Sequence, residues 1–205
     1  MPRHHVIISG TGRAGTTFVV QLFTALGLDT GFSDVNAEVE ANCNAGMERD
    51  IRDPAAPYII KTPWMCDYLD SVLARGDVVV DRAFVPMRDL FAAAESRRDV
   101  TRRTDPALFP GEIPGGLWHT GIPERQEEVL TRQLYQLLHA LAKHDVPTTL
   151  LYFPRLVTDA GYLRAKLADV LGDVPVDRFH AAFRSVARPE LVHQFVAGPA
   201  PPPRE

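Results

Sequence analysis

The chain has 205 residues, of which 45% are hydrophobic and 23% charged. These values are typical of a globular protein, and the length suits a single domain with a sizeable core. The formal net charge is −4. This value argues against broad binding to nucleic acid, because surfaces that bind nucleic acid carry an excess of positive charge. Any site for an anion must therefore gather its cations locally.

The sequence shows no sign of a membrane span, an export signal or a metal motif. No run approaches the roughly 18 apolar residues of a membrane span. The N-terminus leads directly into an apolar run, without a separate hydrophobic signal segment. The two cysteines, Cys43 and Cys66, form neither a metal motif nor a disulfide framework. We therefore expect a cytoplasmic protein in a reducing compartment, with no metal cofactor and no nucleic-acid partner.

The most informative stretch lies near the N-terminus. Residues 5–9 form a short, β-branched apolar run that is typical of a buried parallel strand. Residues 10–15 (GTGRAG) contain three glycines, and residues 16–26 place apolar side chains at helical spacing up to Gly27. A strand, a glycine-rich loop and a helix in this order predict a phosphate-binding cradle. The loop turns its N–H groups inward, and the helix N-terminus adds partial positive charge.

The glycine loop differs from an ordinary nucleotide-binding P-loop in the position of its cation. Residues 10–17 fit the pattern G-x-x-x-x-G-x-[ST], but Thr16 stands where the usual lysine would be. Arg13 supplies a cation three residues earlier. Because the lysine of an ordinary P-loop contacts the β- and γ-phosphates, its absence argues against simple ATP chemistry.

Three segments resemble those of sulfotransferases that use 3′-phosphoadenosine 5′-phosphosulfate (PAPS). Residues 13–18 (RAGTTF) resemble the family's 5′-phosphosulfate loop, [KR]-[ST]-G-T-T, with Ala14 in place of the hydroxyl residue. Residues 88–96 (RDLFAAAES) resemble its R-D-P-x-x-x-x-x-S segment, which holds the 3′-phosphate, with Leu90 in place of the proline. Residues 59–63 (IIKTP) resemble its strand ending in Lys-[TSD]-[HP]. The resemblance is to the short bacterial members of the family.

The resemblance implies transfer of a sulfuryl group from PAPS to a hydroxyl or amine of a small-molecule acceptor. Arg13 and Lys61 would stabilise the charge that develops on the bridging oxygen and the sulfuryl group. Arg88 and Ser96 would bind the 3′-phosphate, since arginine supplies a planar fork of donors and serine a hydroxyl. The 5′-phosphosulfate would be bound by Gly12, Arg13, Ala14, Gly15, Thr16 and Thr17.

The general base and the acceptor pocket are less clearly marked. Pro63 stands where enzymes with Lys-Thr-His carry a histidine, so a carboxylate would have to serve. We prefer Glu48, because residues 44–48 (NAGME) are typical of a loop that approaches the site. The alternatives are Glu40, Asp34 and His119. The candidates for an apolar acceptor pocket are Phe32, Trp64, Phe109 and Trp118. Candidates to replace the family's basic C-terminal segment are Arg184 and Arg188.

The alternation of strands and helices predicts an α/β fold of the P-loop type. We expect three layers, with a central parallel sheet flanked by helices and the glycine-loop strand in its interior. Strands are predicted at 5–9, 57–63, 83–87 and 148–153. Helices are predicted at 16–26, 64–74, 90–98, 124–144, 159–171, 177–186 and 189–196. Irregular segments are predicted at 28–57, with one short helix, and at 100–123, as a flexible loop or lid. The predicted domain spans 1–198, followed by a proline-rich tail at 199–205.

Two other classes of function remain open. The first is a P-loop kinase with a displaced cation, for which residues 78–81 (VVVD) are the nearest imitation of a Walker B segment. The second is a nucleotide-binding module without catalysis, which the missing histidine after Lys61 supports. Magnesium-dependent ATP turnover would favour the kinase, and tight donor binding without turnover would favour the module.

Overall fold

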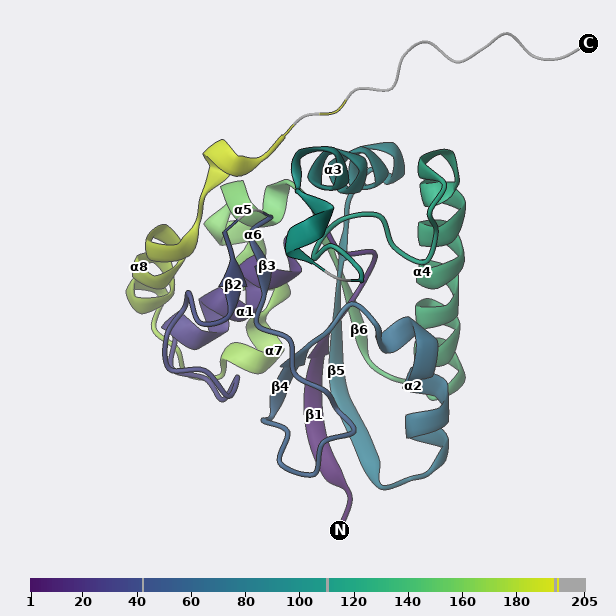
Figure 1. The fold of residues 1–205 in the computed structure, drawn as a ribbon. Coiled ribbons are helices and arrows are strands. Elements are labelled where there is room, and N and C mark those ends of the chain that lie inside the picture. The colour runs from purple at the N-terminus through teal and green to yellow at the C-terminus, as the bar shows by residue number, and fades with distance from the viewer. Residues whose placement is uncertain (42, 110, 194, 196–205) are drawn as a thin grey trace, which may run out of the picture.

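Strand β1 (Arg3–Ile8) lies in the interior of a four-stranded parallel sheet whose order is β4-β1-β5-β6. The computed structural model describes residues 1–41, 43–109, 111–193 and 195. The other strands of the sheet are β4 (Ile59–Lys61), β5 (Val78–Met87) and β6 (Thr148–Tyr152). Figure 1 shows the sheet between two groups of helices. The predicted three-layer α/β fold with a central parallel sheet is therefore confirmed.

Helices cover both faces of the sheet. They are α1 (Thr16–Ala25), α2 (Met65–Ala74), α3 (Leu90–Arg103), α4 (Gln126–Lys143), α5 (Arg155–Thr158), α6 (Ala160–Lys166), α7 (Ala168–Leu171) and α8 (Val176–Val186). Single 3₁₀ turns are η1 (Pro106–Leu108), η2 (Pro123–Arg125) and η3 (Pro189–Leu191). Among the described residues, none of these helices has the length and apolar character that crossing a membrane requires.

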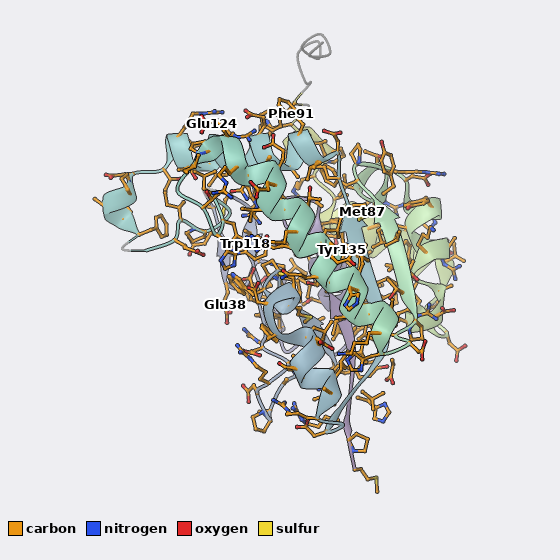
Figure 2. All side chains as sticks on the ribbon, turned by 90° about the vertical axis from the view of Figure 1, so that its right-hand side faces the viewer. Glu38, Met87, Phe91, Trp118, Glu124 and Tyr135 are labelled. Atoms are coloured by element: carbon orange, nitrogen blue, oxygen red, sulfur yellow. The ribbon has the colours of Figure 1, made fainter. Side chains whose placement is uncertain are left out.

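The sheet separates two apolar cores. Val6 and Ile8 of β1 pack on one side, with α1 and α8. Ile7 points to the opposite side and packs with α2 and α4. Figure 2 shows α4 along this second face, with Tyr135 on its outer side. Because both faces of β1 are buried, the strand is a continuous apolar run rather than an alternating one, as the sequence indicated.

Five predicted helices and four predicted strands are found, with some changes at their ends. The helices predicted at 16–26, 64–74, 124–144 and 177–186 agree with α1, α2, α4 and α8 to within two residues. Strand β5 begins at Val78, five residues before the predicted start at 83. Its first half pairs with β1, and its charged residues reach the surface, where Arg82 contacts Asp169. These charged side chains interrupt the apolar pattern that would have marked the strand.

Pro86 was predicted to mark a strand end or bulge, and it lies just beyond the end of the β1 partner. The carbonyl oxygen of Phe84 accepts a hydrogen bond from the Ser9 N–H at 3.1 Å. Because successive backbone groups in a strand alternate sides, Pro86 faces the same side two residues later. There β1 has already ended and the glycine loop has begun. The missing N–H of Pro86 therefore removes no bond to β1 from the sheet.

Other predictions of local structure were wrong. The described part of 28–57 forms no helix but contains a hairpin of β2 (Val39–Glu40) and β3 (Ala45–Gly46). Positive φ angles at Glu38, Asn44 and Met47 exclude a helix there. The helix predicted at 90–98 is present as α3 but runs five residues further. The helix predicted at 159–171 is divided into α6 and α7, and the short helix α5 precedes them. Of 189–196, the structure has only η3 as a helical turn among the described residues. The tail at 199–205 lies outside the described residues.

The segment predicted as a flexible loop or lid at 100–123 begins instead after α3, at Thr104. Its later part is held by hydrogen bonds that are buried or partly buried. The Leu117 N–H donates to Thr101 Oγ1 and the Trp118 N–H donates to Gln126 Oε1, both at 2.8 Å. Residues 111–118 are therefore a fixed wall against α3 rather than a loose lid, and we refer to them as the wall segment.

Candidate functional site

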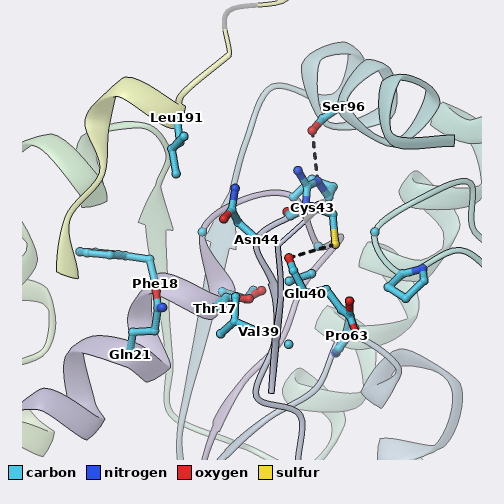
Figure 3. Close-up of a pocket in the computed structure, with 18 of the residues that line it drawn as sticks. Thr17, Phe18, Gln21, Val39, Glu40, Cys43, Asn44, Pro63, Ser96 and Leu191 are labelled. Carbon is cyan, nitrogen blue, oxygen red and sulfur yellow. Dashed lines mark hydrogen bonds between the residues drawn. The ribbon is translucent and has the colours of Figure 1, made fainter. Parts of the chain in front are cut away.

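The predicted site residues meet at the carboxyl edge of the sheet. The glycine loop follows β1, Lys61 is the last residue of β4, and Arg88 directly follows β5. In open parallel sheets, ligands bind in the crevice outside this edge. A cavity of about 840 Å³ opens here, and Figure 3 shows residues of α1, the hairpin, α3 and η3 around it. Of the predicted residues, its lining contains Gly12, Arg13, Gly15, Thr16, Thr17, Glu48, Lys61, Arg88 and Ser96. Ala14, in the same loop, is fully buried and is not part of the lining.

The glycine loop is bent by a series of left-handed residues. The φ angles are 65° at Gly12, 54° at Arg13 and 87° at Gly15. A side chain at Gly15 would be strained, since its Cβ would also come within 3.0 Å of a Leu156 methyl group. Gly15 is the N-cap of α1, and no side chain of the described residues caps the helix there. The first N–H groups of α1 are thus left for an anion to bind.

Arg13 and Ser96 are in direct contact. Arg13 Nε donates to Ser96 Oγ at 3.1 Å, and Arg13 Nη1 donates to the carbonyl oxygen of Cys43 in the hairpin. Ser96 comes from α3, which begins two residues after Arg88, so a residue of a later helix reaches back to the loop (Figure 3). The guanidinium of Arg13 therefore links the glycine loop, α3 and the hairpin.

Arg88 also contacts the glycine loop. Its Nη1 donates to the carbonyl oxygen of Arg13 at 3.0 Å, and its Nη2 donates to the carbonyl oxygen of His193. The guanidinium carbon lies 4.9 Å from the centre of the Phe153 ring. The structure thus brings Arg88 and Ser96 to the same residue of the loop, and the two groups predicted for a second anion adjoin the first anion site.

Arg97 is a site residue that sequence reasoning missed. It is only 5% exposed, yet it lies beside the loop. Its Nη2 donates to the carbonyl oxygen of Thr11 and its Nη1 donates to that of Gly116, both at 2.8 Å. The signal that could have found it is its place on α3, four residues after the buried Ala93 and next to Ser96, where a charged side chain must face inward.

The site brings together three arginines that lack a carboxylate partner among the described residues. Within the described residues, Arg13, Arg88 and Arg97 form no ion pair, and their hydrogen bonds go to carbonyl and hydroxyl oxygens. Burial lowers the pKa of all three, most clearly to about 10 at Arg88 and about 9 at Arg97. The neighbouring charge of Arg13 adds to this fall in the pKa of both Arg88 and Arg97. A bound anion would relieve this strain between like charges.

Lys61 and Glu48 form a pair at the other side of the loop. Lys61 is 2% exposed, and its Nζ contacts Glu48 Oε1 and donates to the carbonyl oxygen of Gly46 at 3.0 Å. Burial lowers the pKa of Lys61, and the Glu48 carboxylate opposes this effect. The Arg49 N–H donates to the Lys61 carbonyl oxygen at 3.0 Å, which fixes Glu48 beside the strand end. The two residues predicted for catalysis are therefore adjacent.

Only some of the remaining candidate residues line the cavity. The cavity lining includes Glu40 but neither Asp34, which accepts from the Asn36 N–H, nor His119, which faces Asp67. Of the aromatic candidates, the lining includes Trp64 and Trp118 but neither Phe32 nor Phe109. Of the two C-terminal arginines, it includes Arg188 but not Arg184.

Asp81, the acidic residue of the possible Walker B segment, lies far from the loop. It pairs with His4 Nδ1 at 2.8 Å and accepts from the Tyr58 hydroxyl at 3.0 Å. The sheet register sets His4 opposite Val79 near the start of β1, whereas the glycine loop follows the end of that strand. In this geometry, Asp81 cannot hold a metal ion beside a phosphate bound at the loop.

The fold and site together define an α/β protein with a cationic cavity at a glycine loop. Comparison of the chain with protein-family models, with curated proteins and with solved structures found no match. What bears on function is therefore the geometry of the site and the resemblance of the three sequence segments.

Proposed function

We propose that the chain is a sulfotransferase that moves a sulfuryl group from PAPS to a hydroxyl or amine of a small-molecule acceptor. The observation that carries the proposal is the convergence of Arg13, Arg88 and Ser96 at the glycine loop. PAPS is anionic at two places, its 5′-phosphosulfate and its 3′-phosphate. A loop with a free helix N-terminus, beside a second arginine and a serine, offers donors for both.

The residues of the cavity suit a direct transfer without a covalent enzyme intermediate. The acceptor oxygen or nitrogen forms a bond to sulfur as the bond between sulfur and the 5′-phosphate oxygen breaks. Glu48 takes the acceptor proton, while Lys61 and Arg13 stabilise the negative charge that grows on the phosphate oxygen. Positioning and charge stabilisation supply the rate enhancement, as in phosphoryl transfer.

The geometry favours this proposal over a magnesium-dependent kinase. A P-loop kinase needs an acidic residue near the glycine loop to hold the metal ion. Asp81, the residue proposed for that role, instead pairs with His4 and Tyr58 near the opposite end of the sheet. The lysine position of the loop is filled by Thr16.

Calorimetric titration should separate these functions. The chain should bind 3′-phosphoadenosine 5′-phosphate (PAP), the product of the donor, with micromolar affinity, and more tightly than ATP with magnesium. Replacement Arg88→Ala should weaken PAP binding by about tenfold or more, because a charged hydrogen-bond donor to the phosphate is lost. The matched control is Arg82→Ala, which should leave affinity unchanged, because Arg82, in the strand that precedes Arg88, contacts Asp169 outside the cavity lining. Preference for ATP with magnesium would contradict the proposal.

A further inference from the structure

Arg97 connects two parts of the cavity that are far apart in sequence. Its Nη2 holds the carbonyl oxygen of Thr11, directly before Gly12, and its Nη1 holds that of Gly116 in the wall segment. The guanidinium carbon also lies over the buried ring of Trp118, 4.8 Å from the ring centre. One side chain therefore contacts the donor loop and the opposite wall at the same time.

The glycine loop rests on this guanidinium. A Cβ atom placed on Gly12 would come within 2.5 Å of Arg97 Nη2, so a larger residue at position 12 is disfavoured because it would displace the guanidinium. The φ angle of 65° at Gly12 points to the same conclusion. Arg97 Nη2 therefore packs directly against the loop at Thr11 and Gly12.

Burying a guanidinium without a carboxylate is costly, and core stability alone does not require it. An apolar side chain of similar length would fill the same space without the desolvation cost. Arg97 Nε is also buried and has no hydrogen-bond partner among the described residues. The next residue shows the ordinary solution, because Arg98 pairs with Glu95 and Glu127. The presence of an arginine at position 97 is therefore explained better by its hydrogen bonds to the Thr11 and Gly116 carbonyl oxygens than by packing.

We propose that Arg97 is a positioning residue that fixes the glycine loop against the wall segment, so that the loop N–H groups face a bound anion. This inference rests on the proposed function only in that the loop binds an anionic ligand. Arg97 acts through the Thr11 and Gly116 carbonyl oxygens and does not need to touch the ligand. The planar fork of arginine spans two carbonyl oxygens in fixed directions, which an ammonium on a flexible stem does not do.

The test compares PAP and inorganic pyrophosphate binding to wild type, Arg97→Lys and Arg97→Gln. Lysine keeps the charge and loses the fork, whereas glutamine keeps one amide donor and loses the charge. Both variants should bind both probes about tenfold more weakly or worse, with an unchanged far-ultraviolet circular dichroism spectrum. Arg98→Gln is the control, because it should lower the thermal midpoint while changing the two affinities by less than about twofold.

Chemical rescue separates positioning from a general loss of stability. Guanidinium at millimolar concentration should restore at least half of the lost affinity in Arg97→Ala, by filling the site of the missing group, and should not do so in Arg98→Ala. Wild-type affinity in Arg97→Lys would show that charge alone matters, and wild-type affinity in Arg97→Gln would show that the residue has no role. Either result would overturn the inference, as would failure of the rescue in a folded Arg97→Ala variant.

The two probes also separate this inference from the proposed function. If wild type binds pyrophosphate but not PAP, the sulfotransferase proposal fails, and the Arg97 comparison proceeds with pyrophosphate. If wild type binds neither anion, both proposals fail. If wild type binds both anions and the Arg97 variants bind them with wild-type affinity, the functional proposal stands and the positioning role is wrong.

Discussion

Replacing Lys61 by methionine should lower the turnover of PAPS by about 100- to 1000-fold, while the affinity for PAP changes by less than about fivefold. Lys61 Nζ is buried beside the glycine loop and directed toward Glu48 and the Gly46 carbonyl oxygen. A preorganised cation in such a site interacts most strongly with charge that appears only in the transition state. The measurement is the rate at saturating PAPS over a panel of phenol, alcohol and amine acceptors.

Methionine is chosen because it keeps the length and packing of the buried stem. Loss of the ammonium still leaves Glu48 without its partner, so stability must be followed in parallel. The double variant Lys61→Met with Glu48→Gln should recover part of any lost stability and none of the turnover. Lys143→Met, which removes an exposed lysine paired with Asp70, should leave turnover unchanged.

Equal losses of turnover and PAP affinity in Lys61→Met would mean that the lysine only holds the ligand. The same comparison applies to Arg13→Ala, for which we also expect turnover to fall more than affinity. A wild-type chain that binds PAP tightly but turns over no acceptor in the panel would contradict the prediction. It would favour the nucleotide-binding module without catalysis.

Replacing Gly46 by alanine should lower the free energy of unfolding by about 3 kcal/mol. The φ angle at Gly46 is 145°, and an added Cβ would lie 1.9 Å from the Glu38 carbonyl oxygen. Since this oxygen belongs to the backbone of the same hairpin, no side chain can rotate to make room. The expected result is loss of the β2–β3 hairpin and, with it, of the carbonyl oxygen that Lys61 contacts.

Gly76→Ala provides the control for this experiment. Gly76 also has a positive φ angle, 75°, but nothing lies within 4 Å of an added Cβ. Its replacement carries only the backbone strain, about 1 kcal/mol. Chemical unfolding of both variants measures the difference. Similar losses at the two positions would show that the contact with Glu38 is easily relieved.

The fold could be predicted largely because its main signals are local. The apolar run before Gly10 is continuous because β1 is buried on both faces, and the stripe on α4 follows helical spacing. The signals failed where tertiary contacts decide the structure. The start of β5 carries Asp81 and Arg82, whose charges find partners only when His4 and Asp169 are placed beside them.

The candidate site could be predicted only in part for the same reason. Arg13, Lys61 and Arg88 stand at strand ends or in a loop of recognisable spacing, so their gathering at one sheet edge follows from a parallel topology. Arg97 has no motif of its own, because its partners are the backbone carbonyl oxygens of Thr11 and Gly116. Any residue type can offer a carbonyl oxygen, so the sequence carries no trace of these contacts.

The hairpin carbonyl oxygens have a consequence for how a ligand enters. Arg13 donates to the carbonyl oxygen of Cys43, and Lys61 donates to that of Gly46. The hairpin backbone therefore accepts hydrogen bonds from side-chain N–H groups that a sulfate or phosphate oxygen would also accept. Where the two compete for the same donors, uptake of the ligand and detachment of the hairpin are reciprocally coupled. A second molecule that binds the attached hairpin would then lower the affinity for the ligand, and the ligand would lower the affinity for that molecule by the same factor.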